Sequence, residues 1–262
     1  MSAYTETLEL QKRLKDKSAE TILRVAVNNF PGRGVFASSL GAEDQVITDL
    51  IVSLKLDIPI FTLDTGRLYN ESYELISETE RKYSIKIKIY TPDRKEVEEM
   101  VNENGVNLFR KSEKLRKRCC QVRKLEPLKR ALADYSAWIC GLRREQSVTR
   151  EDITEIDWDG THRMPKFNPL VDWTEEDVWN YIREHDVPYN KLHDRGFPSI
   201  GCACCTRAVK PGEDIRAGRW WWEEPEQKEC GLHLVNGKFI RTKDLNIEDH
   251  NEQISIKPTK TA

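Results

Sequence analysis

The sequence predicts an α/β protein with an open, mainly parallel sheet flanked by helices. Between residues 35 and 104, short apolar stretches typical of buried strands alternate with amphipathic stretches that have the period of a helix. Alternation of this kind builds βαβ units, in which the strands run parallel. The chain has 262 residues, enough to bury a substantial core. Towards its end the sequence is rich in Gly, Pro, Cys and Trp, which predicts an irregular C-terminal segment.

The individual elements follow from the spacing of apolar residues. Helical spacing predicts a first helix over residues 3–28, which the turn at Pro31–Gly34 ends. Strands are expected at residues 35–38, 58–63, 85–90 and 136–140. Helices are expected at residues 42–54, 69–83, 95–104, 123–133 and 173–184, the last capped by Asp172 or Thr174. We expect one domain over residues 1–243 and a polar, mobile tail over residues 244–262.

Composition excludes several classes of protein. Lys and Arg number 42 and Asp and Glu number 44, a net charge of −2, whereas a general nucleic-acid-binding protein is usually basic. The apolar run at residues 47–56 is interrupted by Asp49, Ser53 and Lys55, so it falls short of the roughly 20 apolar residues of a membrane-spanning helix. The N-terminal residues are polar. We therefore expect a cytoplasmic protein that binds neither nucleic acid nor membrane.

Two loops that follow predicted strands have the composition of anion-binding sites. The candidate residues of the first loop are Ser38, Ser39, Gly41 and Asp44. Those of the second loop are Thr65, Gly66 and Arg67. Both loops should lie at the carboxyl edge of the sheet, where open α/β sheets bind ligands, and the helix after the first loop directs its positive end there. The first loop alone fits a serine-capped helix equally well, so the prediction of a nucleotide site depends on both loops.

A third loop, after the strand expected at residues 136–140, carries Arg143, Arg144 and Arg150. Guanidinium groups are always charged and offer donors in a fixed geometry, which suits phosphate or sulfate. A basic loop exposed to solvent is the alternative, and we would prefer it if this loop stood alone. Beside the other two loops, we interpret the three arginines as part of an anion site.

Four of the seven cysteines predict a metal–sulfur centre. Cys119 and Cys120 are adjacent, and Cys202 and Cys205 form a CxxC motif. Clustered cysteines in a reducing compartment indicate metal binding or redox chemistry rather than a disulfide framework. Adjacent cysteines cannot form the knuckle of a zinc ribbon unless the backbone bends sharply, whereas an iron–sulfur cluster accepts four thiolates. The pattern therefore favours a [4Fe-4S] cluster, with zinc as the alternative.

The other three cysteines differ in their surroundings. Cys140 ends an apolar stretch, which is typical of a buried core thiol. Cys204 lies inside the CxxC motif as an additional thiol. Cys230 lies in a polar segment beside Lys228 and His233. An exposed cysteine near cationic side chains is a candidate nucleophile, although most cysteines in proteins are structural.

These segments match a known pattern. From about Ser38 to His233 the sequence resembles the assimilatory adenosine 5′-phosphosulfate (APS) reductases, within the phosphoadenylyl-sulfate (PAPS) reductase family. The segments that carry the resemblance are Ser39–Asp44, Leu63–Arg67, Lys117–Cys120, Gly201–Arg207 and Lys228–His233. Five such segments in the same order argue against a chance match.

The resemblance implies an adenine nucleotide α-hydrolase-like fold and reduction of APS to sulfite and AMP. It implies that Cys230 is the nucleophile, in a C-terminal catalytic segment over about residues 206–243. The side chains it implies around the sulfate are Lys124, Arg216, Arg219 and His233. Nothing resembling a thioredoxin domain follows in the sequence, so a separate thioredoxin is the expected reductant. Members with the cluster cysteines generally use APS, and members without them use PAPS.

Several alternatives stay open at this point. The protein could be a PAPS reductase or accept both nucleotides, and the family often has Pro where Cys204 stands, which leaves the role of this thiol open. An ATP pyrophosphatase-type enzyme would share the sheet and the first loop. A zinc-stabilised binding module would explain the cysteines without catalysis. The run Trp220–Trp222 indicates core packing or a subunit interface, and we expect a homo-oligomer.

Overall fold

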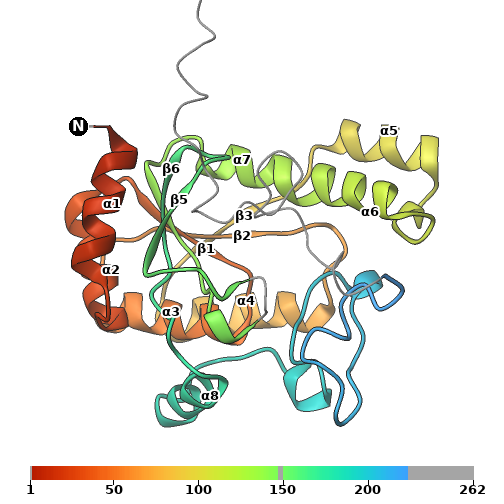
Figure 1. The fold of residues 1–262 in the computed structure, drawn as a ribbon. Coiled ribbons are helices and arrows are strands. Elements are labelled where there is room, and N and C mark those ends of the chain that lie inside the picture. The colour runs from red at the N-terminus through yellow and green to blue at the C-terminus, as the bar shows by residue number, and fades with distance from the viewer. Residues whose placement is uncertain (1, 147–149, 224–262) are drawn as a thin grey trace, which may run out of the picture.

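The computed structural model describes residues 2–146 and 150–223 and confirms the predicted fold class (Figure 1). One six-stranded sheet forms the centre, with the strand order β3-β2-β1-β4-β6-β5. Its strands are β1 (Gly34–Ser38), β2 (Ile60–Leu63), β3 (Ile87–Tyr90), β4 (Ala137–Ile139), β5 (Ile156–Asp159) and β6 (Met164–Phe167). Neighbouring strands run parallel except β5 and β6, which form an antiparallel pair.

The central strand β1 is buried on both faces. Its Phe36 aligns with Ile60 of β2 and with Ile139 of β4. Val35 and Phe36 are both fully buried, and because successive side chains of a strand point to opposite faces, they belong to two different hydrophobic clusters. Burial on both faces is typical of parallel sheets, and it explains why this strand reads as a continuous apolar run.

Helices cover the sheet. The α-helices are α1 (Ala3–Leu14), α2 (Ala19–Asn29), α3 (Ala42–Ser53), α4 (Asn70–Tyr83), α5 (Arg94–Asn104), α6 (Glu113–Cys120), α7 (Glu126–Leu132) and α8 (Glu175–Glu184). In the view of Figure 1, α3 and α4 lie below the sheet, α7 lies above it, and α1 and α2 lie at the end near β5 and β6. Within the described residues, no helix is long and apolar enough to cross a membrane.

The predicted helix over residues 3–28 is wrong as a single element. Helix α1 ends at Leu14, Asp16 adopts a left-handed backbone conformation with φ of 58°, and Ser18 then caps α2. Leu14 and Ile22 are both buried on the core after this turn. The break therefore lets two short helices pack where one straight helix could not.

The predicted helix over residues 123–133 is part of a longer helical segment. It is preceded by α6 and joined to it by a π-helical stretch, Gln121–Leu125. A π turn inserts an extra residue into the helix and re-aims the side chains around it, and such turns are frequent at functional sites. Of the two residues predicted to cap the helix that begins near residue 173, Thr174 rather than Asp172 caps α8, through a capping box with Asp177.

The sequence analysis missed the antiparallel pair β5–β6. Two features obscure it, because β5 carries two aspartates among its four residues and Pro165 lies within β6. The signal that could have found it is Asp159-Gly160, a dipeptide typical of hairpin turns. This pair extends the sheet beyond β4 and gives α1 a surface to pack on.

Candidate active site

A pocket of about 290 Å³ opens at the carboxyl edge of the sheet, around the ends of β1, β2 and β4. The strand order reverses between β1 and β4, and open α/β sheets bind ligands at such a point. The predicted substrate-binding residues that line the pocket are Ser38, Ser39, Gly41, Asp44, Thr65, Arg67, Lys124, Arg150, Arg216 and Arg219. The pocket is also lined by the predicted metal ligands Cys119, Cys120, Cys202 and Cys205. The fold thus brings ten of the predicted substrate-binding residues and all four predicted metal ligands to one cavity.

The loop after β1 is organised by the buried carboxylate of Asp44. Its Oδ2 accepts hydrogen bonds from Ser39 N at 2.6 Å and from Ser39 Oγ at 2.5 Å. Leu40 adopts a φ of 64° and donates its backbone N–H to Ser38 Oγ at 3.2 Å. Helix α3 begins at Ala42, which lines the pocket. The donors of Ser39 thus serve Asp44, and the positive end of α3 is the feature that favours an anion here.

Asp44 should make the stability of the protein depend on pH. Burial raises the pKa of this carboxyl from 3.8 to about 6, although hydrogen bonds from Ser39 oppose the change. Between about pH 4 and about pH 6 the folded protein therefore retains a proton that the unfolded chain has lost, so the free energy of unfolding falls as pH rises. The shift corresponds to a loss of about 3 kcal/mol.

The Asp44→Asn variant should lack this part of the pH dependence. We expect the difference in unfolding free energy between parent and variant to change over this pH range and to be constant above it. Urea denaturation at stepped pH values measures both curves, and subtracting them cancels the groups common to the two proteins. Parallel curves would contradict the assignment to Asp44.

Gly141, which follows β4, allows the loops after β1 and β4 to meet. A Cβ at this position would overlap Asp44 Oδ1 and would lie 3.0 Å from the Cβ of Glu43. The backbone N–H of Gly141 also donates a hydrogen bond to Asp44. The approach of the two loops at the pocket floor therefore requires a residue without a side chain at position 141.

Gly141→Ala should destabilise the protein by about 1–3 kcal/mol, because the added methyl group has to displace the buried Asp44 side chain. Gly34→Ala is the matched control, since a Cβ at residue 34 has Phe30 O at 3.7 Å as its nearest neighbour, an ordinary contact. Urea denaturation of both variants measures the effect. Equal urea midpoints for the two variants would show that the contact between the two loops tolerates a side chain at residue 141.

The loop after β2 supports the cysteines as well as lining the pocket. Thr65 Oγ1 lies 3.2 Å from Cys202 Sγ, and Arg123 Nη1 donates to Thr65 O at 2.8 Å. Gly66 does not line the pocket; it adopts a φ of 69°, and a Cβ there would lie 3.3 Å from Arg123 Nη1. Its contribution is therefore the turn itself, which Gly adopts without strain.

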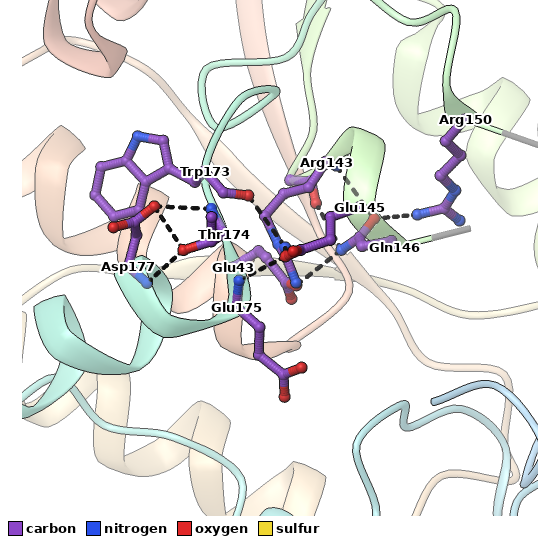
Figure 2. A network of polar contacts seen from close by, with 10 residues as sticks. Glu43, Arg143, Glu145, Gln146, Arg150, Trp173, Thr174, Glu175 and Asp177 are labelled. Atoms are coloured by element: carbon purple, nitrogen blue, oxygen red, sulfur yellow. Dashed lines mark hydrogen bonds and ion pairs between the residues drawn. The ribbon is translucent and has the colours of Figure 1, made fainter. Parts of the chain in front are cut away.

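Arg143 does not itself line the pocket, and it lies in a network of polar contacts that includes the pocket-lining residues Glu43 and Gln146 (Figure 2). Its side chain is 2% exposed and forms ion pairs with Glu43 Oε1 at 2.9 Å and Glu145 Oε2 at 3.1 Å. Glu145 Oε2 also accepts from the backbone N–H of Glu175, the first residue of α8. Arg143 therefore joins α3, the loop after β4 and α8, and it does not reach the predicted anion site.

Arg144 and Arg150 have different positions. Arg144 also lies outside the pocket, where it pairs with Asp172 and donates from Nε to Ile153 O at 2.8 Å. Arg150 lines the pocket and donates to Gln146 Oε1. Of the three arginines predicted in this loop, the structure brings Arg150 to the cavity, because carboxylates elsewhere pair with the other two.

Cationic side chains surround much of the cavity. Those that line it are Arg67, Arg116, Arg123, Lys124, Arg150, Arg216 and Arg219. Arg219 donates from Nη1 to Ile200 O at 3.2 Å, and a Cβ at Gly201 would overlap its guanidinium group. The prediction missed His193, which lines the pocket and whose pKa is lowered by burial. No local sequence motif marks this histidine, because only the tertiary structure brings its loop to the pocket.

The two adjacent cysteines lie directly before the π-helical stretch, and both reach the pocket. Cys119 and Cys120 are the last residues of α6, and the π turn starts at Gln121. Cys119 is buried and Cys120 is half-buried, and both line the pocket. Arg116, one turn earlier, hydrogen-bonds to Cys120, and Arg123 opposes the rise that burial causes in the pKa of Cys119.

The CxxC segment packs in the same hydrophobic cluster as Cys119. Cys205 is buried, whereas Cys202 and Cys204 are half-buried. Hydrogen bonds from Cys205 and Arg67 lower the pKa of Cys204, and the contact with Cys204 raises the pKa of Cys205. All the cysteines of the described residues are free thiols. Among these residues, no three His, Cys, Asp or Glu side chains converge closely enough to hold a single metal ion.

Two predicted site residues, Cys230 and His233, lie outside the described residues. The same holds for the tail predicted over residues 244–262 and for much of the segment predicted over about residues 206–243. The described part of that segment ends with Trp220, which is buried, and Glu223, whose carboxylate pairs with Arg116. The prediction that Trp220–Trp222 pack in the protein is confirmed for Trp220, which lies in a cluster with Cys119 and Cys205.

The fold and the pocket define an adenine nucleotide α-hydrolase-like protein with a thiol-lined site. Residues 33–208 match the family model of the phosphoadenosine phosphosulfate reductase domain. The chain belongs to this family, and the alternative of a zinc-stabilised binding module is thereby set aside. A solved PAPS reductase from Candida auris, in a phosphate complex, has a TM-score of 0.67 and 29% identity over 78% of this chain and 96% of that one.

Curated relatives are more similar still. An adenosine 5′-phosphosulfate reductase of Allochromatium vinosum is 57% identical over 199 residues, which cover 76% of this chain and 78% of that protein. One of Burkholderia cepacia is 53% identical over 200 residues, 76% of this chain and 80% of that protein. An FMN adenylyltransferase of Candida glabrata shares the fold, with a TM-score of 0.52 and 15% identity over 87% of this chain and 78% of that one.

Proposed function

We propose that this protein reduces adenosine 5′-phosphosulfate to sulfite and AMP, with thioredoxin as the electron donor, in cytoplasmic sulfate assimilation. The observation that carries the proposal is one pocket lined by nucleotide-type loops, cationic side chains and the cysteines of both motifs. The relatives named above, which are APS reductases at 53–57% identity, support the same substrate.

The cationic lining suits the substrate. APS carries negative oxygens on both its phosphate and its sulfate, and an attacking thiolate is repelled unless these charges are offset. Lys124, Arg150, Arg216 and Arg219 line the cavity and can supply this compensation, as can the N-terminus of α3. We assign Lys124, Arg216, Arg219 and His233 to the sulfate end of the substrate.

Cys230 is the nucleophile in this proposal. Its thiolate attacks the sulfuryl sulfur, an S–S bond forms, the S–O bond to the phosphate breaks, and AMP leaves with the electron pair. A thioredoxin thiolate then attacks Cys230 Sγ and releases sulfite, and the second thioredoxin thiol frees Cys230, so thioredoxin supplies both electrons. Cys140 also lines the pocket, but burial raises its pKa to about 12, which makes it a poor nucleophile.

The thiols of the pocket fit a [4Fe-4S] cluster held by Cys119, Cys120, Cys202 and Cys205. These four free thiols come from two segments that face one cavity. Trp220 is buried in a hydrophobic cluster of side chains with Cys119 and Cys205. Its indole Nε1 has no hydrogen-bond partner in the described part of the chain, so this N–H could donate to a sulfur atom of a bound [4Fe-4S] cluster. When bound, the cluster would stabilise this wall of the pocket and influence its electrostatics.

The second candidate is a PAPS reductase or an enzyme that accepts both nucleotides. The likeness to the PAPS reductase of Candida auris favours it. We prefer APS because the cluster-type cysteines accompany APS use in the family that the sequence resembles. The single domain over residues 1–243 and the homo-oligomer stay predictions.

Steady-state rates with the two nucleotides test the proposal. Sulfite and AMP should form in equal amounts with APS and reduced thioredoxin, and kcat/KM should be at least about tenfold higher for APS than for PAPS, a difference of about 1.4 kcal/mol in transition-state binding. A preference for PAPS would favour the second candidate. Release of pyrophosphate from ATP without sulfite would reject both.

A further inference from the structure

The wall of the pocket that carries the CxxC motif has a third thiol. Cys204 lies between the two predicted ligands, in the short 3-10 turn Ala203–Cys205, and it lines the same cavity. The distance between Cys204 Sγ and Cys205 Sγ is 3.7 Å. Side chains of consecutive residues usually diverge, so this approach of two sulfur atoms depends on the tight turn that both residues share.

The separation has a specific meaning for metal chemistry. Two thiolates bound to one metal ion at about 2.3 Å with tetrahedral angles lie about 3.8 Å apart. The two sulfurs are therefore spaced so that a metal atom reached by one could also be reached by the other. Cys202 differs from Cys205 in its neighbour, because the group that lies 3.2 Å from Cys202 Sγ is the hydroxyl Oγ1 of Thr65 and not a second thiol.

We propose that Cys204 is an exchange ligand, a thiolate that can take the place of Cys205 on the same iron atom. The inference rests on the proposed cluster and concerns a ligand that the four-cysteine assignment does not include. In the exchange the Cys204 sulfur loses its proton as it binds and the released Cys205 sulfur takes one up, so no electrons move and the charge of the site is unchanged. Arg67 donates a hydrogen bond to Cys204, and its positive charge can stabilise the thiolate form of this residue.

The experiment compares anaerobically purified variants of the full chain. Iron and acid-labile sulfide are measured per chain in the parent, Cys204→Ser, Cys205→Ser, the double variant Cys204→Ser/Cys205→Ser, and Cys202→Ser as the matched control. We expect Cys204→Ser to resemble the parent, Cys205→Ser to retain at least about half of the iron, and the double variant and Cys202→Ser to fall below about a tenth.

Alkylation provides a readout that does not depend on activity. Iodoacetamide should modify Cys204 in the native parent, because this thiol is half-buried and not a ligand there, and mass spectrometry of the peptides locates the label. In Cys205→Ser the same thiol should be protected until iron is removed with a chelator. Protection of Cys204 in this variant would support the exchange directly.

The outcomes separate the two hypotheses. A Cys205→Ser protein that is as iron-poor as the double variant, or that does not fold, would overturn the exchange, since Cys204 would then fail to replace its neighbour. A Cys204 that is alkylated equally in parent and Cys205→Ser would overturn it as well. A parent chain without iron and sulfide would reject the proposed cluster itself.

Discussion

Cys230→Ser is expected to reduce sulfite formation by at least about a thousandfold while APS still binds. A serine hydroxyl stays protonated at neutral pH and lacks the nucleophilicity of a thiolate, and an S–O product could not be resolved by a thioredoxin thiol. The described pocket retains its cationic lining in this variant, because the side chains concerned lie elsewhere in the chain. Binding of the nucleotide should therefore change little, and the loss should appear in kcat.

Intact mass measurement after anaerobic incubation with APS identifies the nucleophile. The parent, kept free of thioredoxin, should gain one sulfonate group per chain, and Cys230→Ser should gain none. Cys140→Ser is the control, because Cys140 lines the pocket but is buried with a pKa raised to about 12. This control should still form the adduct. A sulfonate on the Cys230→Ser protein would reject the assignment.

Glu223→Gln is expected to destabilise the protein by about 3–5 kcal/mol, because it removes the carboxylate charge that neutralises a buried arginine. Arg116 has no exposed side-chain surface, and Glu223 is 6% exposed. The Arg116 guanidinium bonds to both oxygens of this carboxylate, from Nε to Oε1 at 2.9 Å and from Nη2 to Oε2 at 2.7 Å. It also lies 4.6 Å from the centre of the Trp220 ring.

The matched control uses an exposed ion pair of the same helix. Glu113 and Lys117 are 2.6 Å apart on α6, with 34% and 48% of their side chains exposed. Glu113→Gln should cost far less than Glu223→Gln, because this exposed pair is solvated and screened. Urea denaturation compares the two variants, and iron content provides a second measurement because Arg116 also contacts Cys120. Similar urea midpoints for both variants would show that the buried Arg116–Glu223 pair contributes no more to stability than the exposed pair.

The predictions that failed share a physical origin. The break at Asp16 carries no Pro or Gly, and its local signal is only the cap residue Ser18; the turn is held by Glu155, whose Oε1 accepts from the backbone N–H of Asp16 at 2.7 Å. Arg116 stands among basic residues that do not mark it as buried, yet it is fully buried, because Glu223, more than a hundred positions away, pairs with it. Arg143 has a side chain suited to binding an anion, but its guanidinium group is paired with Glu43 of α3. In each case the deciding partner is remote in the sequence.

The sequence by itself determined the alternation of strands and helices, the loops at the carboxyl edge and the cysteine motifs. It could do so because strand and helix periods, turn residues and CxxC spacing are local properties of the chain. The tertiary structure alone decided which arginines reach the pocket and that His193 joins them. Burial and charge pairing set these positions, and both depend on contacts that form when the whole chain folds.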